Sequence, residues 1–118
     1  MRNLGKIILD KREDPIPVYD GVSMGGGVIQ FECSKCQSTV EKETFNFLTD
    51  EQAPTKEQKE ELSKFFDAVY EPACRQRSEF GFMRCPGCCQ EYALYIGFGE
   101  VQSGRYQTSL VAVAECAV

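Results

Sequence analysis

Four cysteines of this chain occur as two Cys-x-x-Cys pairs. Cys33 and Cys36 form the first pair, Cys85 and Cys88 form the second, and residues 37–84 lie between them. A Cys-x-x-Cys turn lets two thiolates reach one ion, and two such turns supply the four soft ligands of a tetrahedral zinc site. Because sulfur would fill every coordination position, no position would remain for water or substrate. The pattern therefore predicts one structural zinc ion.

Other chemistries of these sulfurs stay open. Rubredoxin-like iron uses the same four thiolates, and a thiol switch would oxidise the pairs and release zinc. A dithiol oxidoreductase is less favoured, because neither pair opens a helix. Cys74 and Cys116 belong to neither Cys-x-x-Cys pair and are interpreted as small buried hydrophobic residues. Cys89 is interpreted as a bystander that could replace Cys88 if the turn slipped by one residue.

The composition removes several classes of function. The chain has 118 residues and no histidine, so imidazole cannot activate a nucleophile or bind a metal. No cofactor motif is present, and the sequence predicts a protein that is not an enzyme. No apolar run reaches the roughly 20 residues that a membrane helix requires. The N-terminal stretch lacks the features of a signal peptide, so we expect a cytoplasmic protein, in which cysteine pairs favour metal over disulfides.

The elements that would position the cysteines are short strands and one helix. Runs with strand character include 28–32, 38–47, 80–83, 92–98 and 106–118, and they flank both cysteine pairs. Thr55 and Gln58 have the form of a capping box, and apolar residues follow at helical spacing, which predicts an amphipathic helix over 55–74. Residues 1–24 are expected to form an extended N-terminal segment, with one short strand-like run over 6–9 and a turn-rich stretch over 14–21 whose prolines hold the backbone extended. The sequence predicts an α+β fold with an antiparallel sheet of about five strands.

The paired motif resembles a zinc ribbon, in which two strand–turn–strand units share one zinc ion. The resemblance covers roughly half of the chain and implies a single zinc-ribbon-like domain over 1–118, with 55–74 as an inserted helix. Many ribbons read CPxCG. Here Cys85-Pro86-Gly87-Cys88 matches the first four positions, but Cys89 takes the place of glycine. In the first pair Ser34 replaces proline and Gln37 replaces glycine.

The net charge of −5 and its distribution point to a protein partner. Acids are in clear excess between Glu41 and Glu71, and a basic partner would complement such a segment. In size, charge and general style the chain resembles the small acidic immunity proteins of bacterial toxin–immunity systems, including contact-dependent growth inhibition. That resemblance implies tight binding to a toxin domain, often a basic nuclease. The expected binding surface comprises Asp50, Glu51, Glu57, Glu60, Glu61 and Asp67.

The alternative function is a nucleic-acid-binding ribbon that acts as a regulatory or accessory factor. Phosphate binding requires clustered lysine and arginine residues, which displace counterions from the nucleic acid. The acidic balance of this chain makes nucleic acid a disfavoured partner. The residues that would serve this function are Lys35, Arg75, Arg77, Arg84 and Arg105.

Overall fold

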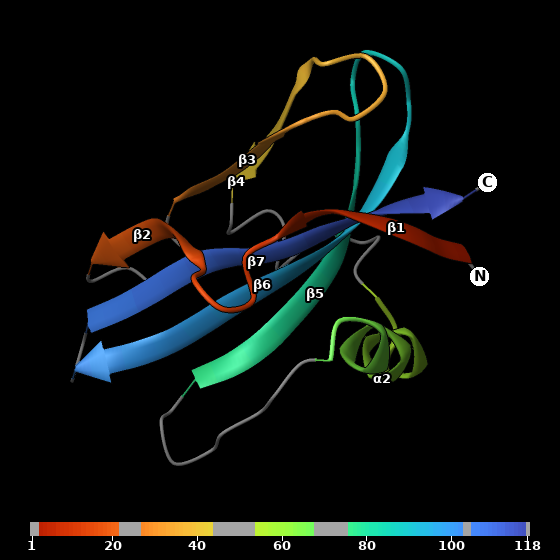
Figure 1. Ribbon diagram of the computed structural model, residues 1–118. Helices are drawn as coiled ribbons and strands as arrows, with labels where there is room; N and C mark the ends of the chain where they lie inside the picture. The colour runs from red at the N-terminus through yellow and green to blue at the C-terminus, as the bar shows by residue number, and fades with distance from the viewer. Residues whose placement is uncertain (1–2, 22–26, 44–53, 68–75, 103–104, 118) are drawn as a thin grey trace.

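The computed structural model describes residues 3–21, 27–43, 54–67, 76–102 and 105–117. Within these ranges the chain forms seven strands and one helix (Figure 1). In chain order they are β1 (Asn3–Asp10), β2 (Ile16–Gly21), β3 (Val28–Glu32), β4 (Thr39–Glu43), α2 (Lys56–Phe65), β5 (Gln76–Arg84), β6 (Glu91–Gln102) and β7 (Arg105–Ala117). In this part of the chain no helix has the length and apolar character needed to cross a bilayer.

Five of the strands make the main sheet, and β7 is its centre. The order β1-β7-β6-β5 is antiparallel throughout, and β2 pairs with the same edge of β7 as β1. β1 pairs with 112–117 of β7 and β2 pairs with 106–110, so the two short strands follow one another along a single edge. Pro17 is tolerated in β2 because an edge strand has one side on which no N–H is needed.

The remaining two strands form a hairpin that covers one face of the sheet. β3 and β4 pair in continuous antiparallel register. In β3 the buried residues Ile29 and Phe31 alternate with exposed ones, which gives the hairpin one apolar face. That face packs on the sheet and buries a core made of Ile29, Phe31, Cys33, Val40, Met83, Cys85, Tyr92, Leu94, Ile96, Leu110 and Val113.

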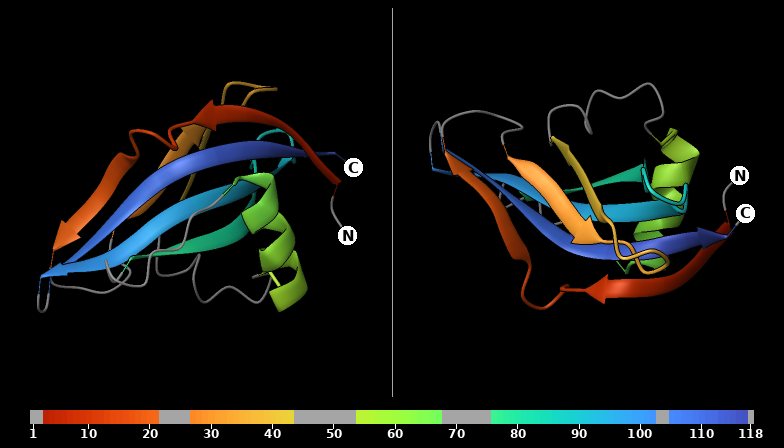
Figure 2. Two further views of the ribbon diagram at one scale, coloured as in Figure 1. Left: turned by 60° about the horizontal axis from the view of Figure 1, so that its bottom comes forward. Right: turned by 90° about the horizontal axis from the view of Figure 1, so that it is seen from above.

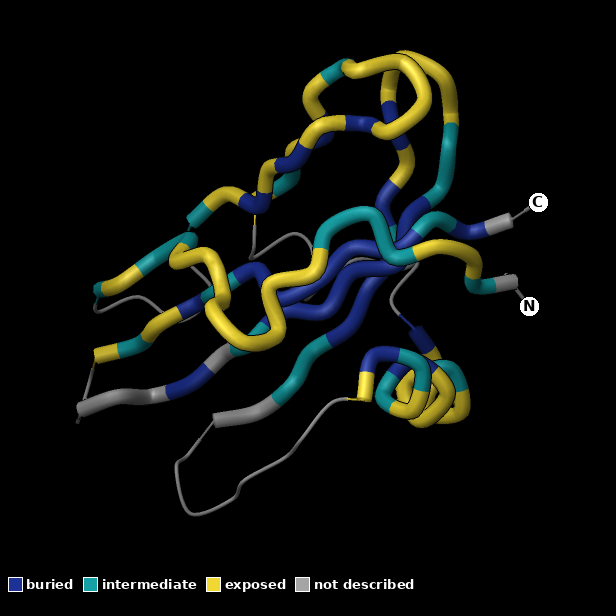
Figure 3. Tube along the Cα trace, viewed as in Figure 1, coloured by how far each residue is buried: buried dark blue, intermediate teal, exposed yellow. Residues whose placement is uncertain are grey.

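The helix α2 covers the opposite face of the sheet, so the molecule has three layers (Figures 1 and 2). Leu62 and Phe66 are buried against a second set of sheet residues, which includes Phe80 and Tyr95. Thr55 and Gln58 form the predicted capping box. Exposed positions concentrate on the outer side of α2 and in the loops (Figure 3).

The predicted helix over 55–74 was too long. Phe66 caps the helix at its C-terminal end, and Asp67 has a left-handed backbone with φ of 52°. Val69 and Tyr70, which the apolar spacing placed on the helix, lie outside the described residues. Phe66 is still buried, although it is the C-cap residue at which the helix ends. The apolar spacing in the sequence therefore extends past the last helical residue.

The coarse fold prediction is confirmed, since the described chain is mostly antiparallel sheet with one helix. The strand number was underestimated, because the N-terminal segment contributes two strands where one short run was expected. Its prolines were expected to keep the backbone extended, and β2 runs extended along the edge of β7. That residues 1–118 form a single zinc-ribbon-like domain stays a prediction.

Candidate metal centre

Each Cys-x-x-Cys pair lies in the tight connection of a β-hairpin. Cys33 directly follows β3 and Cys36 precedes β4, while Cys85 follows β5 and Cys88 precedes β6. We call residues 33–38 the first cysteine turn and residues 85–90 the second cysteine turn. The two hairpin ends lie side by side at one end of the molecule (Figure 1). The tertiary fold therefore brings together the two pairs that the sequence separates.

The two cysteine turns have the same backbone hydrogen bonds. In the first, the amide of Cys33 donates to the Ser38 carbonyl at 2.9 Å and the amide of Gln37 donates to the Cys33 carbonyl at 3.0 Å. In the second, the amides of Cys85 and Cys89 make the equivalent bonds, both at 2.9 Å.

Both turns then require a left-handed residue after their second cysteine. Gln37 has φ of 62° and Cys89 has φ of 65°. This is the position at which CPxCG ribbons carry glycine, which adopts positive φ without steric cost. Cys89 is thus a turn-forming residue, and its side chain is exposed.

The four sulfurs of Cys33, Cys36, Cys85 and Cys88 lie within 4.8 Å of one another. Across the two turns, Cys33 Sγ is 3.6 Å from Cys88 Sγ, and Cys36 Sγ is 3.6 Å from Cys85 Sγ. Tetrahedral coordination with metal–sulfur bonds of 2.3 Å places sulfurs about 3.8 Å apart. The four side chains are therefore positioned to bind one metal ion, and all four cysteines are free thiols.

Backbone amides point at the sulfurs, as the charge of thiolate ligands requires. The amide of Lys35 donates to Cys33 Sγ and that of Gly87 donates to Cys85 Sγ, each at 3.4 Å. Gly87 also lies where the turns touch, since a Cβ there would come within 3.1 Å of Cys36 Sγ and 2.8 Å of Ser38 Oγ. A side chain at position 87 would require Ser38 Oγ and Cys36 Sγ to shift.

Burial and hydrogen bonds shift the pKa values of Cys33, Cys36 and Cys88 in different directions. Cys33 and Cys85 are buried, whereas Cys36 and Cys88 are exposed. Burial raises the pKa of Cys33, but hydrogen bonds from the Tyr92 hydroxyl and from backbone amides outweigh it and lower that pKa to about 6. The hydroxyl and amide of Ser38 lower the pKa of Cys36. The backbone amide at Gln90 lowers the pKa of Cys88, but desolvation and the three neighbouring sulfurs raise it to about 12.

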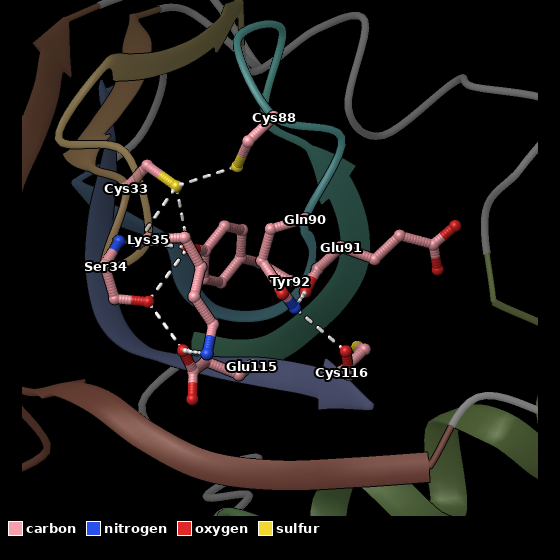
Figure 4. Close-up of polar contacts among 9 residues, drawn as sticks. All are labelled: Cys33, Ser34, Lys35, Cys88, Gln90, Glu91, Tyr92, Glu115 and Cys116. Carbon is pink, nitrogen blue, oxygen red and sulfur yellow. Dashed lines mark hydrogen bonds and ion pairs between the residues drawn. The ribbon is translucent and has the colours of Figure 1, made fainter. Parts of the chain in front are cut away.

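Tyr92 is a residue of this site that the sequence did not indicate. It is fully buried on β6, and its hydroxyl oxygen lies 3.1 Å from Cys33 Sγ. The same oxygen accepts from the Ser34 amide at 3.0 Å and lies 3.0 Å from Ser34 Oγ. Ser34 Oγ donates to Glu115 on β7 at 2.6 Å, and Lys35 Nζ lies 3.7 Å from that carboxylate (Figure 4). This network ties the first cysteine turn to the main sheet.

The second cysteine turn is held by its own contacts. Gln90 Nε2 donates to the Cys116 carbonyl near the end of β7 at 2.9 Å (Figure 4). Arg84 and Glu91, which flank the turn on β5 and β6, form an ion pair at 2.8 Å. The buried Cys116 lies in the core on the helix side of the sheet, while Cys74 lies outside the described residues.

The predicted acidic surface is described in part. Glu57, Glu60 and Glu61 are exposed on α2, and Asp67 is exposed just beyond it. Asp50 and Glu51 lie outside the described residues. Lysines share this surface: Lys56, Lys59 and Lys64 are also exposed, and Lys59 Nζ lies 3.9 Å from Glu79. The described part of the helix surface is therefore of mixed charge.

Three of the basic residues expected to bind nucleic acid in the alternative function form ion pairs with acidic residues. Arg105 contacts Asp20 at 2.6 Å, Arg84 contacts Glu91, and Lys35 contacts Glu115. Arg75 and the side chain of Arg77 lie outside the described part. Arg105 is on the end of β7 away from the cysteine turns, so the three basic residues that the structure describes do not form one patch.

Comparisons of the chain with protein-family models, with curated proteins and with solved structures give no match.

Proposed function

We propose that this protein is a non-catalytic zinc-binding module that acts through protein–protein interaction. The observation that carries the proposal is the cluster of four cysteine sulfurs within 4.8 Å, contributed by two matching turns. Zinc is favoured because it accepts four thiolates in tetrahedral geometry and needs no redox partner. A site closed by four sulfurs has no position for substrate, which supports a structural role for the ion.

The metal content of the purified protein tests the first part of the proposal. Protein prepared under reducing conditions should contain one zinc ion per chain, as measured by inductively coupled plasma mass spectrometry. Replacing Cys36 or Cys88 with serine should abolish stoichiometric zinc, whereas Cys89→Ser should leave it unchanged, because Cys89 lies outside the cluster. Iron in place of zinc would change the identity of the proposed metal. Protein that contains no metal would overturn the proposed metal site.

The partner that we propose is a basic protein domain, in keeping with the acidic balance of the chain. A toxin nuclease domain is the candidate, with this protein as its immunity protein. The exposed carboxylates Glu57, Glu60 and Glu61 would then contact the partner. Attraction between such charges raises the association rate, and added salt should lower that rate because it screens the attraction.

Titration against a toxin nuclease domain encoded beside this chain tests the second part. We expect one-to-one binding and loss of nuclease activity in the complex. Exchanging Glu57, Glu60 and Glu61 for glutamine should slow association, while Lys56→Gln should not. A zinc-loaded protein that neither binds nor inhibits the domain would overturn the immunity function and leave the metal assignment standing. Salt-sensitive binding to RNA or DNA would favour the alternative function.

A further inference from the structure

The hydroxyl of Tyr92 meets three groups of the first cysteine turn, and its hydrogen bonds can be counted. A tyrosine hydroxyl has one proton to donate and lone pairs to accept with. The Ser34 amide can only donate, so it occupies a lone pair of the Tyr92 oxygen. The Tyr92 proton is left with two candidate acceptors, Ser34 Oγ at 3.0 Å and Cys33 Sγ at 3.1 Å.

Glu115 and the charge on Cys33 decide between these acceptors. An ionised carboxylate accepts only, so the single proton of Ser34 Oγ goes to Glu115 across 2.6 Å. A cysteine that ligates a metal is a thiolate, which likewise only accepts. Hydrogen bonds to a charged acceptor are stronger than those between neutral groups. With a metal bound, the Tyr92 proton therefore faces Cys33 Sγ.

We propose that Tyr92 is a positioning residue of the metal centre, which donates its hydroxyl hydrogen to the Cys33 sulfur and fixes the first cysteine turn on the main sheet. This inference rests on the proposed metal centre. Tyr92 suits the role because its ring is fully buried between the layers, edge-on to Phe31 at a centroid distance of 5.0 Å. Packing therefore holds the ring in place and fixes the position of the hydroxyl oxygen.

The two cysteine turns differ at the residue that serves this network. Position 34 follows the first cysteine of its turn, and Pro86 occupies the equivalent position of the second turn. Proline has no amide hydrogen. The serine that departs from the CPxC pattern thus supplies an amide hydrogen bond to Tyr92 and a hydroxyl hydrogen bond to Glu115, neither of which a proline could make (Figure 4). The departure from the pattern has a physical reason in this chain.

Tyr92→Phe tests the inference, and Tyr95→Phe is its matched control. Tyr95 is buried on the same strand but belongs to the core on the opposite face, and its hydroxyl accepts from Ser78 Oγ at 2.9 Å. Removal of a hydrogen bond to a metal ligand typically weakens metal binding by about 10–100-fold. Zinc affinity, measured by competition with a chromophoric chelator, should fall by that factor in Tyr92→Phe and stay near wild type in Tyr95→Phe.

Cobalt spectra separate positioning at the sulfur from a general packing role. With Co²⁺ bound, the loss of a hydrogen bond to the Cys33 sulfur should move the sulfur-to-cobalt charge-transfer band to lower energy in Tyr92→Phe. The band should not move in Tyr95→Phe. A packing role alone would weaken binding and leave the band in place. Equal band energies and equal zinc affinities in the two variants would overturn the inference.

A measurement on the wild-type protein covers the case in which Tyr92→Phe fails to fold. In protein loaded with ¹¹³Cd, a proton-detected correlation should connect the metal with the Tyr92 hydroxyl proton through the Cys33 sulfur. A Tyr92 hydroxyl proton that is resolved but shows no coupling would overturn the inference. Protein that binds neither zinc, cobalt nor cadmium would overturn the proposed metal centre as well, so the two failures are distinguishable.

Discussion

At the scale of single residues, the departures from the ribbon pattern carry the most information. Gln37 and Cys89 occupy left-handed positions that glycine would occupy without strain. Ser34 stands in place of a proline and makes contacts that proline would lose. The first two departures cost conformational free energy, whereas the third is compensated by hydrogen bonds.

Gln37→Gly should stabilise the metal-bound protein by about 0.5–1 kcal/mol. A left-handed backbone costs a residue with a side chain about 1–2 kcal/mol, and the added freedom of glycine in the unfolded chain offsets part of the gain. Urea unfolding in the presence of zinc measures the change. Gln37→Ala is the control and should bring no gain, because alanine keeps the strain. A stabilised alanine variant would contradict the explanation.

The carboxylate of Asp20 should titrate far below its ordinary range. Hydrogen bonds from Arg105 and then from Gln107 lower the pKa of Asp20 from 3.8 to about 2. Because the folded-state pKa is the lower one, the pair stabilises the fold above about pH 4, and this contribution is lost as the pH falls towards 2. NMR titration should show a larger rise of this pKa in Arg105→Gln than in Gln107→Ala, and the reverse order would contradict the assignment.

At the scale of elements, the three layers have separate means of support. The β3–β4 hairpin is attached to the sheet by its apolar face, by the Tyr92 network and by the proposed metal. The helix α2 is attached by Leu62 and Phe66 on the other face, away from the cysteine turns. A defect in the helix should therefore weaken the fold without disturbing the metal site.

Thr55→Ala should lower the free energy of unfolding by about 1 kcal/mol, the usual effect of removing an N-cap side chain. In the capping box, Thr55 Oγ1 accepts from the Gln58 amide at 3.2 Å and Gln58 Oε1 accepts from the Thr55 amide at 2.9 Å. Thr55→Ser keeps the hydroxyl and should retain most of the stability. Urea unfolding gives the energies, and zinc content should stay at one ion per chain. Loss of zinc in Thr55→Ala would show that the layers are coupled.

At the scale of the whole molecule, the proposed metal joins two hairpins that are far apart in the sequence. β5, β6 and β7 form a continuous antiparallel unit, whereas β3 and β4 form a separate sheet. Zinc sites of small domains contribute about 10–16 kcal/mol of apparent binding free energy near neutral pH, which is comparable to the stability of a domain. Metal binding and attachment of the hairpin layer should therefore be strongly linked.

Removal of the metal with a chelator should release the hairpin layer before the central strands. Hydrogen exchange should show loss of protection over 28–43, while the amides of β6 and β7 keep most of theirs. The physical reason is that β6 and β7 are paired along their length with each other and with neighbouring strands, whereas the hairpin depends on one face and one end. Uniform loss of protection across the whole chain would show instead that the metal controls global unfolding.

The local parts of this structure could be predicted from the sequence. Cys-x-x-Cys spacing specifies a tight turn, a threonine three residues before a glutamine specifies a helix start, and alternating apolar residues specify β3. Each of these features depends on atoms within a few residues of one another. The four cysteines of the site, the α+β class and the start of α2 followed from such features.

The tertiary structure decided the rest, because the remaining contacts join residues far apart in the chain. The helix ends where Phe66 is buried, and the proline-containing N-terminal stretch becomes a strand because the edge of β7 offers partners. The chain has five tyrosines, and only the fold brings one of them to the Cys33 sulfur. By itself the sequence determined which side chains could hold a metal. Their convergence, and the hydroxyl that meets them, depended on packing between the hairpin and the sheet.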